Sequence, residues 1–140
     1  LFCGLSLVAG GVWAQATPAG LWRTIDDETK TEKSLVRISE SAGVFSGKVE
    51  KVADASKQDA TCDKCSDSRK DQKVIGMTIV TGVKKVDGES HFEGGEILDP
   101  NNGKVYRVRM TPKDGGKTLE VRGYIGAPIL GRTQVWQRVE

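Results

Sequence analysis

Apolar and polar residues alternate in short stretches along most of the chain, and turn residues separate these stretches. Residues 34–38 (SLVRI) and 104–111 (KVYRVRMT) alternate in this way, and no stretch after residue 16 keeps a helical period. Period-two alternation is typical of β-strands with one buried face. We predict strands at residues 20–25, 34–38, 44–52, 74–80, 90–98, 104–111, 117–126 and 131–139.

Most of the predicted strands are joined by turns of hairpin length. Residues 99–103 (DPNNG) and 114–116 (DGG) are strong turn signals, because proline presets φ and Asn-Gly accepts positive φ. Sequential antiparallel neighbours favour an up-and-down barrel over a Greek-key sandwich. We therefore expect an all-β fold, a single antiparallel barrel of about eight strands, with a bulge or sharp bend at residues 94–95. Polar residues 53–73 form a long connection, and connections of this length in a compact domain usually have a function or are fixed by additional contacts.

The first 16 residues (LFCGLSLVAGGVWAQA) are uncharged and apolar, and they end in an Ala-Gln-Ala cleavage pattern. They are too short to span a bilayer, and they match a signal peptide that is truncated at its start. Residues 17–140 then form the exported domain. Export predicts a periplasmic or secreted protein, in which cysteines meet an oxidising environment.

Composition excludes several classes of function. The chain of 140 residues carries 21 basic and 19 acidic side chains, a formal net charge of +2, which is too balanced for a nucleic-acid binder that relies on bulk charge. The single histidine, His91, lies in a predicted strand and is expected at the surface. No nucleophile–base arrangement and no phosphate-binding loop is visible. We expect no enzyme activity, no metal, no cofactor and no stable membrane insertion.

Cys62 and Cys65 are the two cysteines that follow the signal peptide, and three interpretations compete for them. A local disulfide would hold the shape of the long connection, and it suits an exported chain best. A thiol redox centre would use the nearby basic residues to lower a thiol pKa, although the helix N-terminus such centres need is not visible. The pair could also be half of a zinc site, but a closed site needs four ligands, and the chain after residue 16 offers one histidine and no further cysteine.

Long segments of the chain resemble a known family. GLWRTIDDETKTEKSLVRI, CDKCSDSRKDQKVIGMTIV, GGEILDPNNGKVYRV and EVRGYIGAPILGRTQVWQRV are similar to the DUF2147 family of exported bacterial proteins. The resemblance implies a small β-barrel related to lipocalins and fatty-acid-binding proteins, and it implies no activity. Gly20 and Trp22 with Arg138 also resemble the lipocalin G-x-W and its C-terminal arginine. In such barrels the tryptophan closes one end, and the arginine packs across its face by a cation–π contact.

Polar and aromatic side chains alternate on the last two predicted strands, at Arg122, Tyr124, Arg132, Gln134, Trp136 and Arg138. If this set faces inwards, it builds a polar cup for a carboxylate or another anion. If it faces outwards, it is an ordinary solvated face, which is where charged residues usually lie. The candidate ligand-binding residues are Tyr106, Arg122, Tyr124, Arg132 and Trp136.

Three functional hypotheses follow. The first is a non-enzymatic barrel that binds a small, partly apolar or anionic ligand. The second is a structural or protein-interaction module that acts through the Cys62–Cys65 loop or an exposed barrel end. Thiol redox activity at the cysteine pair is the third.

Overall fold

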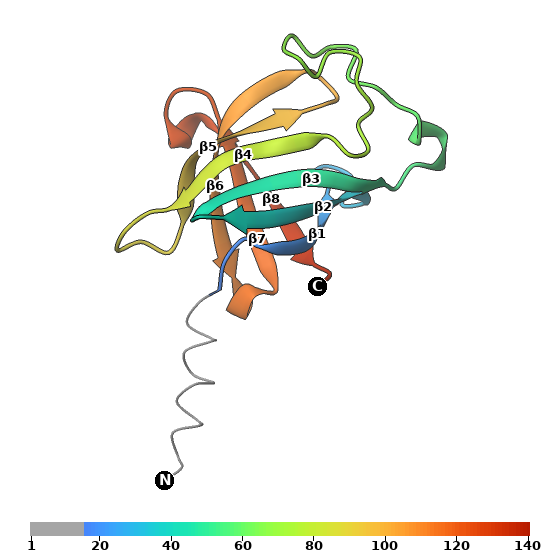
Figure 1. Cartoon of the computed structure of the whole chain (residues 1–140). Helices are drawn as coiled ribbons and strands as arrows, with labels where there is room; N and C mark the ends of the chain where they lie inside the picture. The colour runs from blue at the N-terminus through green and yellow to red at the C-terminus, as the bar shows by residue number, and fades with distance from the viewer. Residues whose placement is uncertain (1–15) are drawn as a thin grey trace.

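The computed structural model describes residues 16–140, so the predicted signal peptide lies outside the described residues except for its last one. The described chain is almost entirely β-structure (Figure 1). Its elements are β1 (Gly20–Ile25), β2 (Glu32–Ser41), β3 (Val44–Val52), η1 (Ala55–Lys57), β4 (Thr78–Lys85), β5 (Phe92–Asp99), β6 (Lys104–Lys113), η2 (Asp114–Gly116), β7 (Thr118–Tyr124), η3 (Pro128–Leu130) and β8 (Arg132–Arg138), where η marks a 3₁₀ turn.

The strands form a closed barrel in sequence order from β1 to β8, and every neighbouring pair is antiparallel. The last strand returns to the first, where Trp22 pairs with Arg138 and Arg23 pairs with Gln137. The prediction of an all-β, up-and-down barrel of eight strands is confirmed. Closure leaves no free sheet edge among these strands, which removes a site for edge-to-edge aggregation.

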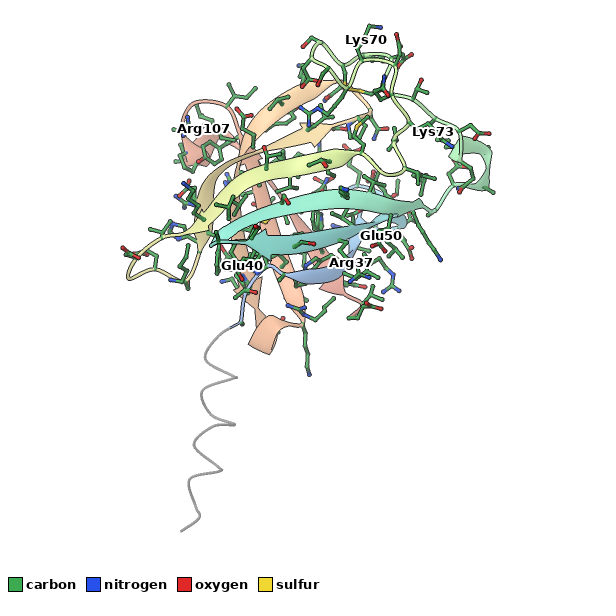
Figure 2. The ribbon with its side chains drawn as sticks, viewed as in Figure 1. Arg37, Glu40, Glu50, Lys70, Lys73 and Arg107 are labelled. Carbon is green, nitrogen blue, oxygen red and sulfur yellow. A yellow bond between two sulfur atoms is a disulfide. The ribbon has the colours of Figure 1, made fainter. Side chains whose placement is uncertain are left out.

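On most strands, the side chains of one parity face the barrel interior and form the core. Val36, Val80, Val108, Met110 and Leu119 have no exposed surface, and they belong to one continuous apolar cluster. The opposite parity carries charged side chains at the outer surface. Arg37 on β2 donates to Glu50 on β3 at 2.6 Å, and Figure 2 labels both on the outside of the sheet. The alternation seen in the sequence therefore separates core from solvent, as strand geometry requires.

The fourth strand is displaced from its predicted position. It was expected at residues 74–80, but β4 runs from Thr78 to Lys85. The backbone turns at Gly76, whose φ of 92° is in the left-handed region, and the side chains of Val74 and Met77 pack against the core. An apolar run predicts burial, but it does not distinguish a strand from a buried loop. The irregularity expected at residues 94–95 is present, because the β5–β6 register shifts between Phe92 and Gly95.

One end of the barrel is closed by a tryptophan and an arginine. Trp22 is fully buried, and its indole N–H donates to the Pro18 carbonyl at 2.7 Å. The Arg138 guanidinium carbon lies 4.3 Å from the centre of the Trp22 ring, which is cation–π geometry. Arg138 also donates to the carbonyls of Gly116 at 2.5 Å, Ala19 at 2.9 Å and Thr17 at 3.2 Å. Burial lowers the pKa of Arg138.

Glycine at position 20 makes this arrangement sterically feasible. Its φ is 139°, and a Cβ atom there would collide with the Arg138 guanidinium and approach the Glu140 carbonyl oxygen to 2.7 Å. A larger residue would displace the arginine from the tryptophan face. Gly20, Trp22 and Arg138 are thus in mutual contact at the closed end.

Replacing Arg138 by methionine should destabilise the barrel by about 2–4 kcal/mol, because three backbone carbonyls lose a charged donor and Trp22 loses its cation. Arg37→Met is the matched control. Arg37 pairs with Glu50 and Glu140 at the surface, so its loss should cost no more than about 1 kcal/mol. Urea unfolding of the two variants tests this, and equal losses of stability would contradict it.

Candidate functional site

A cavity of about 280 Å³ occupies the opposite end of the barrel. Its walls are apolar side chains of several strands, including Val49, Ile79, Ile97, Val121 and Trp136. The mouth lies at the end of the barrel where loops connect β1 to β2, β3 to β4, β5 to β6, and β7 to β8. Figure 1 shows the long β3–β4 connection (green) and the β7–β8 turn (orange-red) along the same side of the molecule. A cavity of this size is at the lower limit of typical small-molecule sites.

Three of the five candidate ligand-binding residues line this cavity: Tyr106, Arg132 and Trp136. Gln134, two residues from Trp136 on β8, lines it as well and accepts a hydrogen bond from the Trp136 indole at 3.2 Å. The Tyr106 hydroxyl accepts a hydrogen bond from the Asn102 side chain at 3.1 Å. Aromatic and amide groups therefore supply polar atoms on an otherwise apolar wall.

Arg122 and Tyr124 lie on the outer face instead. Their neighbours on β7, Val121 and Gly123, line the cavity, so strand alternation turns Arg122 and Tyr124 away from it. The register explains this, because Arg122 pairs with Thr133 and not with Arg132. Arg122 donates to the Thr133 hydroxyl at 2.6 Å and to the Pro128 carbonyl at 2.6 Å. Of the alternating set, only the β8 members thus face inwards.

Tyr124 belongs to a polar cluster on the outside of β5, β6 and β7. Its hydroxyl donates to Glu93, which also accepts from Arg109 at 3.2 Å. Burial and the hydrogen bond to Glu93 raise the pKa of Tyr124. Burial opposes ionisation of Glu93, but the hydrogen bonds from Tyr124 and Arg109 outweigh it and lower its pKa. His91 lies beside this cluster, 3.4 Å from Glu93, and not in the cavity.

Arg132 links the mouth of the cavity to the β1–β2 loop. Two of its nitrogens donate to the carboxylate of Asp27, in the bidentate geometry that arginine favours. The hydrogen bond from Arg132 lowers the pKa of Asp27, and the carboxylate in turn raises the pKa of Arg132. Arg132 is therefore neutralised within the chain and is not a free anion-binding cation.

Two lysines that the sequence analysis did not select also line the cavity. Lys33 is near the start of β2, and Lys57 ends η1. Neither forms an ion pair with a carboxylate within the described part of the chain. Asp99 is the acidic residue among the lining side chains. The lining thus combines one carboxylate with two lysines that form no ion pair within residues 16–140, above a largely apolar interior. Residues 26–33, which are mostly charged, and the long connection at residues 53–73 have no periodic pattern that could have placed the two lysines there.

The cysteines of the long connection form a disulfide, and the favoured interpretation is confirmed. Cys62 and Cys65 are 0% and 3% exposed, and their loop packs against the β5–β6 turn. A Cβ atom on Gly103 would collide with the backbone of Lys64 and lie 2.8 Å from the amide nitrogen of Cys65. The disulfide loop is thus fixed against a turn that contributes Asn101 and Asn102 to the mouth.

Residues 16–140 contain neither a candidate metal cluster nor a helix that could span a membrane. No three His, Cys, Asp or Glu side chains gather there in a way that could hold a metal ion. None of the helical segments in that range has the length and hydrophobicity to cross a membrane.

Comparison with known proteins identifies a family and a solved structure with a similar fold. A family model described as "Uncharacterized protein conserved in bacteria (DUF2147)" matches residues 20–138. The chain belongs to the DUF2147 family. This DUF2147 chain matches no curated protein. Its fold is similar to a solved structure titled "Protein HP1028 from the human pathogen Helicobacter pylori belongs to the lipocalin family", with a TM-score of 0.77. The identity is 23%, over 90% of this chain and 85% of the other, so the likeness establishes a lipocalin-like fold.

Gly103→Ala should loosen the mouth of the DUF2147 barrel. Gly88→Ala is its matched control, because Gly88 has nearly the same φ, 77° against 74°, but no atom lies within 4 Å of an added Cβ. Both variants bear a backbone cost of about 1–2 kcal/mol. Only G103A should lose about 1–3 kcal/mol more and speed amide exchange at residues 60–74. Identical unfolding curves would disprove the contact between the turn and the disulfide loop.

Proposed function

We propose that this protein is a non-enzymatic barrel that binds a small amphipathic anion in its open end. The observation that carries the proposal is the cavity itself, which has largely apolar walls and the side chains of Lys33 and Lys57 among its lining. An aliphatic or aromatic portion would contact Val121, Ile97 and Trp136. A carboxylate or similar headgroup would remain near the two exposed lysines, which attract it by charge.

The polar atoms of the cavity would orient such a ligand. Tyr106 and Gln134 each present a group that already bonds within the chain, to Asn102 and Trp136 respectively. These internal bonds hold the side chains in place before a ligand enters, which lowers the entropic cost of binding. Tyr106, Arg132 and Trp136 remain proposed binding residues, and Arg132 would shape the mouth through its bond to Asp27 without binding the anion itself. Arg122 and Tyr124 are left out, because they lie on the outer face.

The disulfide supports a structural role for the cysteine pair over thiol redox chemistry. Thiol–disulfide exchange needs an attacking thiolate to reach a sulfur atom, and both cysteines are almost fully buried. We propose that the protein functions in the bacterial periplasm after removal of residues 1–16. A disulfide and membership of a bacterial family are compatible with export.

A displacement assay tests the proposed ligand class. The reporter is 1-anilinonaphthalene-8-sulfonate, and the competitors are decanoate, decanol and decyltrimethylammonium, which share a chain length but differ in headgroup charge. Decanoate should displace the reporter at the lowest concentration. Lys33→Gln combined with Lys57→Gln should weaken decanoate binding by about three- to tenfold and leave decanol binding nearly unchanged.

The control is Lys113→Gln combined with Lys117→Gln, which removes two exposed charges from the closed end of the barrel, around η2. It should bind decanoate like the wild type. Failure of all three competitors, or preferential binding of the cationic one, would refute the proposed function.

A further inference from the structure

The turn between β7 and β8 exposes a cluster of aliphatic side chains. Ile125, Ile129 and Leu130 are 62%, 82% and 74% exposed, the highest values among the exposed large hydrophobic residues of the described chain. We call residues 125–130 the apolar tip. Six residues of one turn thus hold three large side chains that the fold leaves in water. Exposed apolar groups gathered in this way mark sites of protein or membrane contact.

The apolar tip has a defined shape. The Leu130 amide donates to the Ala127 carbonyl at 2.9 Å, and the Gly131 amide donates to the Pro128 carbonyl at 3.2 Å. Arg122 supports the turn from its outer side, through the bond to Pro128 at 2.6 Å and a longer one to the Ile129 carbonyl at 3.4 Å. Because these bonds fix the backbone, the aliphatic side chains are presented to solvent by the fold.

Basic side chains border the apolar tip. Arg107 is the strand partner of Tyr124, which directly precedes Ile125, and Figure 2 labels it at this end of the barrel. Lys104 begins β6 at the same end of the barrel, three positions before Arg107 and therefore on the opposite face of the strand. Across residues 16–140, neither Lys104, Arg107 nor Arg122 lies within ion-pair distance of a carboxylate, although Glu96 is the ladder partner of Arg107. The side of the tip next to Arg107 and Arg122 therefore attracts an anionic surface, whereas the carboxylates of Asp26, Asp27 and Glu28 lie near Arg132 at its base.

The size of the apolar tip indicates what it contacts. Three aliphatic side chains offer on the order of 300 Å² of apolar surface, whereas a stable protein interface buries about 800 Å² on each partner. A protruding apolar tip bordered by cations suits the interface of an anionic bilayer, into which side chains enter by about 5–10 Å. We propose that the apolar tip docks this protein reversibly onto a membrane surface that carries anionic lipid headgroups.

Docking would place the cavity mouth at the membrane. Gly123 and Arg132 pair across the base of the β7–β8 turn, and both line the cavity. A ligand could then pass between the bilayer and the barrel over a short path. The docking proposal concerns the outer surface of the turn, so it stands or fails independently of ligand binding in the cavity.

Vesicle co-sedimentation tests the docking. Protein purified after export, without added ligand, is mixed with vesicles of phosphatidylglycerol and phosphatidylethanolamine, and separately with vesicles of phosphatidylcholine. The protein should bind the anionic vesicles, and added salt should weaken binding because it screens the basic residues. Ile129→Ser combined with Leu130→Ser should lower the partition coefficient about tenfold or more.

Two matched controls make the test specific. Val135→Ser combined with Val139→Ser removes two aliphatic side chains that are 46% and 41% exposed elsewhere, and it should change binding less than about twofold. Lys104→Gln combined with Arg107→Gln should weaken binding to anionic vesicles, whereas K113Q/K117Q should not. No binding by the wild type, or equal losses in the tip and control variants, would overturn the proposal. Self-association that only the tip variant abolishes would identify a second copy of the chain as the occupant and would also overturn it.

Discussion

The contact between Arg138 and Trp22 is the interaction on which the rest of the barrel depends. It lies where the last strand returns to the first, at the pairing that closes the sheet. The arginine stacks on a fully buried ring, and its donors satisfy carbonyls of the N-terminal segment and of η2. One side chain of β8 therefore joins residues 17–19 to the β6–β7 turn and seals one end of the interior. The cavity lies at the other end of the barrel.

The open end is held by several separate contacts between neighbouring loops. A disulfide loop of the long connection packs on the β5–β6 turn, Asp27 binds Arg132 across the β1–β2 side, and Arg122 supports the β7–β8 turn. The disulfide loop belongs to the apolar core through Cys62 and Cys65, whereas Arg132 and Arg122 make polar contacts nearer the surface. Turns held by polar contacts near the surface open at a lower free energy than core strands do, which would suit the entry and release of the proposed ligand.

Much of the fold could be predicted, because strand alternation and turn chemistry are local signals. The residues at 20–25 and 44–52 became β1 and β3 with the predicted bounds. The region around residue 76 could not, since the apolar side chains of Val74 and Met77 are buried by a loop rather than by a strand. The candidate site could be predicted only in part, because the sequence does not give the register between strands. Alternation assigns a face within one strand, but the register between strands decides whether Arg122 shares a face with Arg132.

The positions of the two lysines could not be predicted from alternation or turn signals. Lys33 and Lys57 are 24 positions apart in the sequence, and they come together only through the path of the long connection and the curvature of the barrel. No periodic pattern encodes that path. The pairing of Cys62 and Cys65 was easier to predict, since two nearby cysteines in a chain that is expected to be exported favour a disulfide.

The most direct test of the central claim is an NMR measurement of contacts between decanoate and the protein. Intermolecular nuclear Overhauser effects should connect the acyl chain to the Trp136 indole and the Val121 methyl groups, with the carboxylate end nearest to Lys33 and Lys57. The closed end around Trp22 should show no contact. An acyl chain that gives no contacts at saturating decanoate, or contacts only on the outer face of the barrel, would contradict the account of a ligand-binding open end.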